Sequence, residues 1–277
     1  DLVIQSLHKT LPSLTQTAVL HQQSDLVSGE RLERFLGIYQ TSSPSYVLMA
    51  SITACLRYLE ENGGQAFDRY VFRLEQCRRK LSQMKNLYLP GREICGQGGI
   101  FDLDLSKILI SGAGAGIQGP ALHRILREKY RLEMEMEAPG YVLALTSVMD
   151  TEEGFGRLTK ALEEIDSALD QAYPTKAGIH RISIPSFGKY PEEFRPRQEM
   201  TIARAMESEM EEKDLEYGAG RISGEFAYLY PPGIPILTPG EEISREFIQR
   251  AGLWKKQGLE LQGLSDYSLK KIKTVKI

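Results

Sequence analysis

Four residues close to the start of the chain have the types and spacing of a covalent cofactor anchor. Ser6, Leu7, His8 and Lys9 follow a short apolar run, Leu2–Ile4, which predicts a buried strand. A lysine amine at the end of such a strand can form an imine with the aldehyde of pyridoxal 5'-phosphate (PLP). The serine hydroxyl and the imidazole can reach the cofactor phosphate. The pattern therefore indicates a PLP site.

The same spacing is found in other settings. S-x-x-K also occurs in serine–lysine acylases and in β-lactamase-like enzymes. A serine that caps a helix and is followed by a solvated lysine gives the same letters without any chemistry. The four residues alone leave these alternatives open.

A second segment could bind a phosphate group. Residues 114–119 form a G-x-G-x-x-G pattern between a predicted strand and a predicted helix, and Glu133 and Glu135 follow at the distance of a dinucleotide fingerprint. NAD binding is therefore one alternative. A glycine-rich turn with Pro120 at the first helical position is the other, and the alternation of charged and apolar residues in 133–137 favours it, because a core strand of a dinucleotide fold is buried on both faces.

The composition limits the partners that the protein can have. The chain has 277 residues, with 42% hydrophobic and 26% charged residues, and its formal net charge is −3. An acidic balance argues against nucleic acid and against an anionic membrane as partners. Cys55, Cys77 and Cys95 are odd in number and lack metal-ligand spacing, which predicts reduced thiols in a cytoplasmic protein and no metal site. No apolar run has the length of a membrane span.

The periodicity of apolar residues predicts an α/β protein. We expect strands at Leu2–Ile4, Thr15–His21, Asp104–Ser111, Leu132–Glu137 and Tyr141–Ser147, and a strand pair at the C-terminus. We expect helices at Gly29–Gly37, Ser45–Glu61, Gln65–Lys85, Pro120–Tyr130, Thr151–Gln171, Thr201–Glu211 and Ser244–Gly252, with Asn62-Gly63-Gly64 ending the second of them.

Four segments together resemble the ornithine/lysine/arginine decarboxylases. They are SLHKTLPSLTQ, TSSPSY, GRISGEF and YPPGIPILTPGE, in this order and at these distances along the chain. The family consists of aminotransferase-like, fold-type-I PLP enzymes, and the chain is most similar to its short bacterial form. The resemblance implies four parts: the latter part of the PLP-binding large domain (1–85), a small α/β domain (86–172), a linker (173–197) and a C-terminal α+β decarboxylase domain (198–277).

The resemblance also implies roles for individual residues. Lys9 would be the Schiff-base lysine, and Ser6 and His8 would contact the cofactor phosphate. Thr41 would contact the phosphate of the neighbouring subunit's cofactor, because active sites in this family form at a dimer interface. Glu225 and Tyr230 would be substrate-side residues, the alternatives being a solvated strand carboxylate and a rigid structural turn.

The implied reaction is the decarboxylation of arginine, lysine or ornithine to an amine and CO2, in polyamine or agmatine synthesis. The residues that would hold the pyridine nitrogen and cover the ring should precede Asp1, so we expect a companion N-terminal segment. Two alternatives stay open: an aminotransferase, for which Arg124, Arg127 and Arg131 could bind the α-carboxylate, and a non-catalytic fragment that serves as an interaction module.

Overall fold

The structure is a computed structural model that describes residues 1–97, 99–172, 196–230 and 233–276. The chain divides into two compact units. The first contains Asp1–Gln83, Ser106–Ile108 and Leu145–Lys160, and the second contains Met84–Leu105, Leu109–Ala144 and Ala161–Ile277. Most of the predicted linker, residues 173–195, lies outside the described residues. No helix among the described residues is long and apolar enough to cross a lipid bilayer.

The first unit begins with a hairpin. Strand β1 (Leu2–Ser6) pairs antiparallel with β2 (Ala18–Gln22), and the one-turn helix α1 (Leu7–Thr10) lies between them in the sequence. All five residues of β1 are exposed, so the prediction of a buried strand was wrong. The apolar run does form a strand, but its sheet has only these two strands, which cannot enclose a core by themselves.

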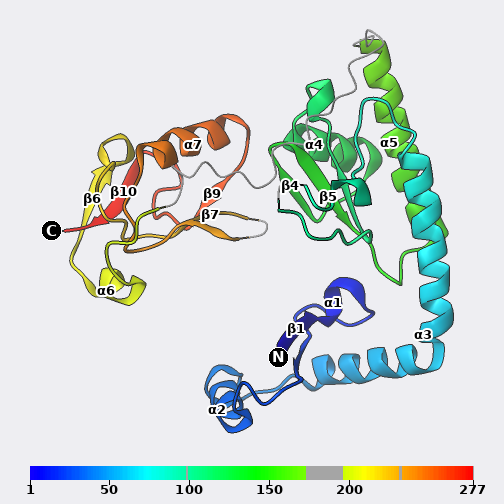
Figure 1. The fold of residues 1–277 in the computed structure, drawn as a ribbon, viewed down its shortest axis with the longest axis horizontal. Coiled ribbons are helices and arrows are strands. Elements are labelled where there is room, and N and C mark those ends of the chain that lie inside the picture. The colour runs from blue at the N-terminus through cyan, green and yellow to red at the C-terminus, as the bar shows by residue number, and fades with distance from the viewer. Residues whose placement is uncertain (98, 173–195, 231–232, 277) are drawn as a thin grey trace. The chain divides into compact units, whose positions relative to one another are not determined.

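Two helices follow the hairpin, α2 (Gly29–Tyr39) and α3 (Tyr46–Leu81), each capped by a serine hydroxyl at its N-terminus. We predicted that α3 would be two helices separated at Asn62-Gly63-Gly64, and this was wrong: α3 is continuous over 36 residues. Glycine lowers helix stability without terminating a helix, and Ala66, Tyr70 and Leu74 are buried beyond it. Figure 1 shows that α3 changes direction between its light-blue and cyan parts.

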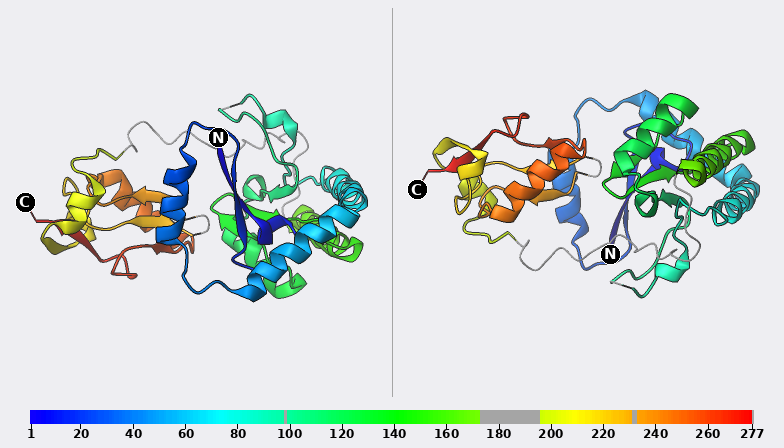
Figure 2. Two further views of the ribbon diagram at one scale, coloured as in Figure 1. Left: turned by 90° about the horizontal axis from the view of Figure 1, so that it is seen from below. Right: turned by 90° about the horizontal axis from the view of Figure 1, so that it is seen from above.

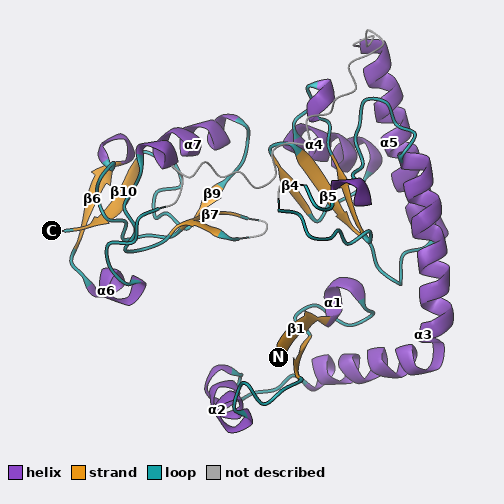
Figure 3. Cartoon of the chain, viewed as in Figure 1, coloured by secondary structure: helices purple, strands orange, loops and turns teal. Residues whose placement is uncertain are grey.

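A small α/β layer comes next. Its elements are η1 (Arg92–Ile94), β3 (Lys107–Ile110), η2 (Ala113–Ala115), α4 (Gly119–Tyr130), β4 (Met136–Ala138), β5 (Tyr141–Leu145) and α5 (Glu152–Ala172). The strands form a sheet in the order β3-β5-β4, in which β4 and β5 are an antiparallel hairpin. Helix α4 packs against β4 (Figure 3). Leu122 and Leu126 of α4 and Val142 of β5 are fully buried.

The C-terminal elements build two further sheets. They are α6 (Ile202–Glu207), β6 (Met210–Asp214), η4 (Leu215–Tyr217), β7 (Ala227–Leu229), β8 (Pro235–Leu237), α7 (Arg245–Lys256), β9 (Leu261–Gln262) and β10 (Lys271–Val275). Strands β6 and β10 pair with each other (Figure 2), and β8, β7 and β9 form a separate sheet. Phe247 and Trp254 of α7 are buried in the core of this part.

Two predictions for the C-terminal elements were wrong. The helix expected over Thr201–Glu211 ends at Glu207, and Met210–Asp214 is a strand whose partner lies some sixty residues further on. The last two strands do not pair with each other, because β9 joins β7 while β10 joins β6. Pairing over such sequence distances leaves no local signal.

Candidate functional site

The four anchor residues occupy the turn from β1 into α1. Ser6 is the last residue of β1 and the N-cap of α1, and its hydroxyl makes no capping hydrogen bond. Leu7 is only 2% exposed and its amide donates to the carbonyl of Thr17 at 3.1 Å. Lys9 is exposed. The buried leucine thus holds the turn against β2, while the lysine amine and the serine hydroxyl lie on the exposed side.

His8 is fixed by a hydrogen bond across the hairpin. Its Nδ1 lies 2.9 Å from the carbonyl oxygen of Thr17. Because a carbonyl oxygen can only accept, Nδ1 carries the proton in this arrangement. Nε2 makes no hydrogen bond to any residue that the structure describes, so it is the ring nitrogen that a ligand could reach.

Thr41 lies in the loop between α2 and α3 and is exposed. Its hydroxyl accepts from the amide of Ser43 at 3.2 Å. Within the described residues it makes no hydrogen bond to Ser6 or His8, so the structure of one chain does not bring Thr41 together with the anchor. A role on a neighbouring subunit's cofactor stays a prediction.

Glu225 has a different environment from the solvated strand carboxylate that was its alternative to a substrate-side role. Its side chain is buried, with 9% exposed, and each carboxylate oxygen accepts from a backbone amide at 2.8 Å, Oε1 from Ser265 and Oε2 from Lys273. It is therefore not a solvated strand carboxylate. The carboxylate joins the segment before β7 to β10 and to the loop that precedes it. Its geometry supports a structural role and gives no support to a substrate-side role.

Tyr230 follows β7 and is 64% exposed. Pro231 and Pro232, which continue its motif, lie outside the described residues. The amide of Gly233 donates to the carbonyl of Leu229 at 2.9 Å, and Gly233 has a φ of 86°, a conformation that glycine adopts readily. These features fit a turn, and the substrate-side role of Tyr230 remains a prediction.

The glycine-rich segment 114–119 has a packing role. A Cβ on Gly119 would overlap the carbonyl oxygens of Ala138 and Tyr141, and the amide of Gly119 donates to the carbonyl of Pro139 at 3.0 Å. The β4–β5 hairpin therefore lies where a pyrophosphate would have to approach α4. In addition, β4 is antiparallel to its neighbour and is not adjacent to β3, unlike the parallel unit of a dinucleotide fold. The structure favours the glycine-rich turn over NAD binding.

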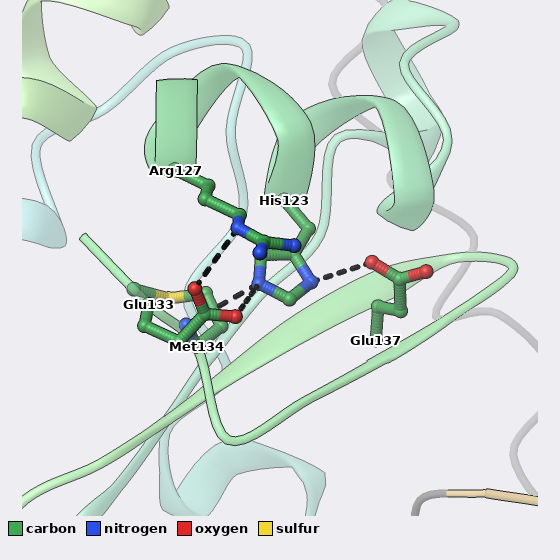
Figure 4. Close-up of polar contacts among 5 residues, drawn as sticks. All are labelled: His123, Arg127, Glu133, Met134 and Glu137. Carbon is green, nitrogen blue, oxygen red and sulfur yellow. Dashed lines mark hydrogen bonds and ion pairs between the residues drawn. The ribbon is translucent and has the colours of Figure 1, made fainter. Parts of the chain in front are cut away.

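A polar cluster on α4 was missed by the sequence analysis (Figure 4). His123 Nδ1 lies 2.5 Å from Glu137 Oε2, and His123 Nε2 lies 3.1 Å from Glu133 Oε1. Arg127 Nε lies 3.2 Å from Glu133 Oε2. Arg127, a candidate ligand for an α-carboxylate, is thus paired with a carboxylate of its own chain. The alternating Glu133, Glu135 and Glu137 are the signal that could have indicated such a cluster.

Two family models match the chain. The model "Orn/Lys/Arg decarboxylase, major domain" matches residues 2–105, and the model "Orn/Lys/Arg decarboxylase, C-terminal domain" matches residues 187–251. The first match contains the anchor residues and the second contains Glu225 and Tyr230. The chain belongs to the Orn/Lys/Arg decarboxylase family.

Curated members of the Orn/Lys/Arg decarboxylase family agree with this assignment. The chain is 31% identical over 276 residues to the arginine decarboxylases of Bacillus anthracis and Bacillus subtilis, with all of this chain and 54% of each relative covered. It is 24% identical to the constitutive lysine decarboxylase of Escherichia coli, with 87% of this chain and 43% of the relative covered. The chain spans about half the length of the family members that it matches.

Solved structures from the Orn/Lys/Arg decarboxylase family have the same fold. The constitutive lysine decarboxylase of E. coli matches with a TM-score of 0.72 at 18% identity, covering 99% of this chain and 49% of that one. The Francisella novicida lysine decarboxylase matches with a TM-score of 0.75 at 19% identity, and the match covers 99% of this chain and 48% of that one. The predicted fold class, an α/β fold-type-I enzyme, is confirmed.

Proposed function

We propose that the protein decarboxylates a basic amino acid with PLP held on Lys9. The observation that carries the proposal is the exposed Lys9 in the β1–α1 turn, flanked by Ser6 and His8, in a chain that belongs to the Orn/Lys/Arg decarboxylase family. The two matching family models and the relatives from Bacillus anthracis and Bacillus subtilis are named as decarboxylases, which favours decarboxylation over a serine–lysine acylase.

The donor groups of the turn fit PLP. The cofactor presents an aldehyde and a phosphate dianion, and the turn offers the Lys9 amine, a Ser6 hydroxyl that makes no capping bond, and His8, whose Nε2 donates to a phosphate when the ring is an imidazolium. When bound, PLP supplies the electron sink that accepts the charge left by the loss of CO2. Ser6 and His8 would bind the phosphate, and Thr41 would contact the phosphate in the site of a second copy of the chain.

Lys9 would also act in proton transfer. Its ε-nitrogen would donate a proton to the reacting carbon of the substrate or accept one from it. This requires the amine to be neutral for part of the cycle, which exclusion of water from the assembled site would favour. Lys9 is exposed in the chain by itself. We therefore infer that a companion segment and a second subunit complete the site, and that the chain alone turns over slowly.

Arginine is the first substrate to test. The relatives that match the chain over its whole length are named arginine decarboxylases, and the lysine decarboxylase from E. coli is less similar. Lysine and ornithine are the other candidates. The product would be an amine for polyamine or agmatine synthesis, and a cytoplasmic location fits that role.

The proposal is tested by product analysis. The chain with its companion segment is incubated with PLP and with arginine, lysine or ornithine, and CO2 and amine are measured. We expect one basic amino acid to give equal amounts of both products. Lys9→Ala should lose at least a thousandfold in rate, and Lys256→Ala, which removes an exposed lysine of α7, should not. Formation of a keto acid instead of CO2 would favour the aminotransferase alternative, and no product at all would favour the non-catalytic one.

A further inference from the structure

A chain of hydroxyl groups connects α3 to the hairpin that carries the anchor. The Thr17 side chain is 2% exposed, and its hydroxyl lies 2.8 Å from Ser13 Oγ and 2.8 Å from the carbonyl of Leu14. Ser13 Oγ lies 3.1 Å from Ser51 Oγ on α3, and the amide of Leu14 donates to the same Ser51 oxygen at 2.7 Å. Ser51 therefore holds the hairpin loop at two points.

This series of hydrogen bonds runs from Ser51 through Thr17 to His8. The carbonyl oxygen of Thr17 accepts two hydrogen bonds, from the Leu7 amide at 3.1 Å and from His8 Nδ1 at 2.9 Å. The hydroxyl of Thr17 keeps that carbonyl in place by fixing the residue to the loop. The hydroxyl of Thr17 is buried, and a buried hydroxyl without a partner is unfavourable, which favours keeping these bonds.

The backbone next to Thr17 is in an unfavourable conformation. Gln16 has a φ of 79°, in the left-handed region that side chains with a Cβ rarely adopt. Such a residue keeps its conformation only where surrounding contacts determine it. The bonds of Thr17, Ser13 and Ser51 are the contacts that the structure offers for this.

We propose that Thr17, Ser13 and Ser51 are positioning residues for the cofactor anchor: they fix the ring of His8 with Nδ1–H donating to the Thr17 carbonyl, so that Nε2 faces the cofactor phosphate beside Lys9 and donates to it when the ring is an imidazolium. The proposal rests on the proposed function for the identity of the ligand. The state of the ring is a property of the chain itself and can be measured without the cofactor.

The first measurement is the tautomer of His8. The full chain is labelled with 15N-histidine, and the His8 signals are assigned by their loss in His8→Gln, since the sequence has four histidines. At a pH where the ring is neutral, we expect wild type to carry the proton on Nδ1. Thr17→Val and Ser51→Ala should give a mixture of tautomers. Thr17→Ser, which keeps the hydroxyl, should restore the wild-type spectrum.

Thr53→Ala is the matched control. Thr53 lies two residues from Ser51 on α3, and its hydroxyl donates to the carbonyl of Met49 in its own helix and to no other residue that the structure describes. Its spectrum should equal that of wild type. If Thr17→Val does not fold, Ser51→Ala carries the test, because Ser51 is only half-buried. A wild-type ring with its proton on Nε2, or a Ser51→Ala ring that keeps the wild-type tautomer, overturns the proposal.

The second measurement is PLP binding by the chain with its companion segment, followed as adduct trapped by borohydride. Thr17→Val and Ser51→Ala should bind PLP about three- to tenfold more weakly, the range expected for one hydrogen bond. Equal affinity in wild type and both variants overturns the positioning role and leaves the proposed function intact. No adduct in wild type overturns the proposed function, and with it the cofactor role of these residues, whatever the tautomer of His8.

Discussion

Leu7 and Lys9 lie two positions apart in a helix of four residues and have opposite environments. Leu7 is almost fully buried and Lys9 is exposed, so the apolar residue anchors the turn that presents the amine. Ser6, His8 and Lys9 could be proposed as a cofactor anchor because they are neighbours in the sequence, and that role stays a prediction. The role of Glu225 could not be predicted, because its two amide partners lie 40 and 48 residues away.

Tyr88 provides a prediction at this scale. Burial, a hydrogen bond from its hydroxyl to Glu93 at 3.0 Å and the charge of Glu93 raise the pKa of Tyr88 from 10.0 to about 12. Glu93→Gln should lower the pKa of Tyr88 and leave it above its ordinary value, because burial remains. Chemical shifts of 13C-labelled tyrosine, assigned with Tyr88→Phe, measure this.

The raised pKa of Tyr88 also determines how the stability of the protein changes with pH. The folded pKa of Tyr88 lies above the unfolded value, so its contribution to stability is complete below about pH 10 and is lost as the pH rises toward 12. Glu153→Gln, an exposed residue of α5, is the control and should leave the Tyr88 titration unchanged. A Tyr88 titration that Glu93→Gln does not alter would contradict the assigned cause.

At the scale of elements, the Glu225 carboxylate connects the β7 region to β10. Glu225→Gln replaces one acceptor oxygen by an NH2 group that faces a backbone amide, so a buried donor loses its partner. We expect the free energy of unfolding to fall by about 1–3 kcal/mol. The single tryptophan, Trp254, is buried in the core of the same part, so its fluorescence reports this unfolding.

Glu212→Gln is the control for that experiment. Glu212 of β6 pairs with Lys271 of β10, but both side chains are about half exposed. An exposed ion pair contributes at most about 1 kcal/mol. Equal losses of stability for Glu225→Gln and Glu212→Gln would contradict a structural role of the buried Glu225 carboxylate.

Helix α3 offers a substitution that should raise the free energy of unfolding, whereas Glu225→Gln should lower it. A Cβ on Gly64 would meet no atom within 4 Å, so packing does not require glycine there. Gly64→Ala should raise the free energy of unfolding by about 1 kcal/mol, because alanine is the better helix former. Gly119→Ala is the contrast, since its Cβ would overlap two carbonyl oxygens of the β4–β5 hairpin. Thermal unfolding followed by circular dichroism compares the two; a Gly64→Ala variant as unstable as Gly119→Ala would refute the argument.

The elements show which parts of the fold a sequence can predict. The starts and ends of α4, α5 and α7 were predicted to within a few residues, because apolar periodicity and caps are local signals. The first two residues of β6, Met210 and Glu211, were predicted to be the end of a helix, because the pairing of β6 with β10 is not visible in its own residues. The exposure of β1 could not be predicted either, since burial depends on what covers a strand.

At the scale of the whole molecule, the chain has the fold of the Orn/Lys/Arg decarboxylase family. The chain matches the fold of lysine decarboxylases over nearly its full length and covers about half of each. The role of Thr41 on a neighbouring subunit's cofactor stays a prediction from the family resemblance. We expect the active species to be at least a homodimer.

The most direct test of the account is the site of cofactor attachment. The chain with its companion segment is loaded with PLP, reduced with borohydride, digested and mapped by mass spectrometry. We predict a phosphopyridoxyl group on the peptide that contains Lys9, and none on that peptide in Lys9→Ala. Attachment to another lysine, or no attachment to the loaded protein, would contradict the account.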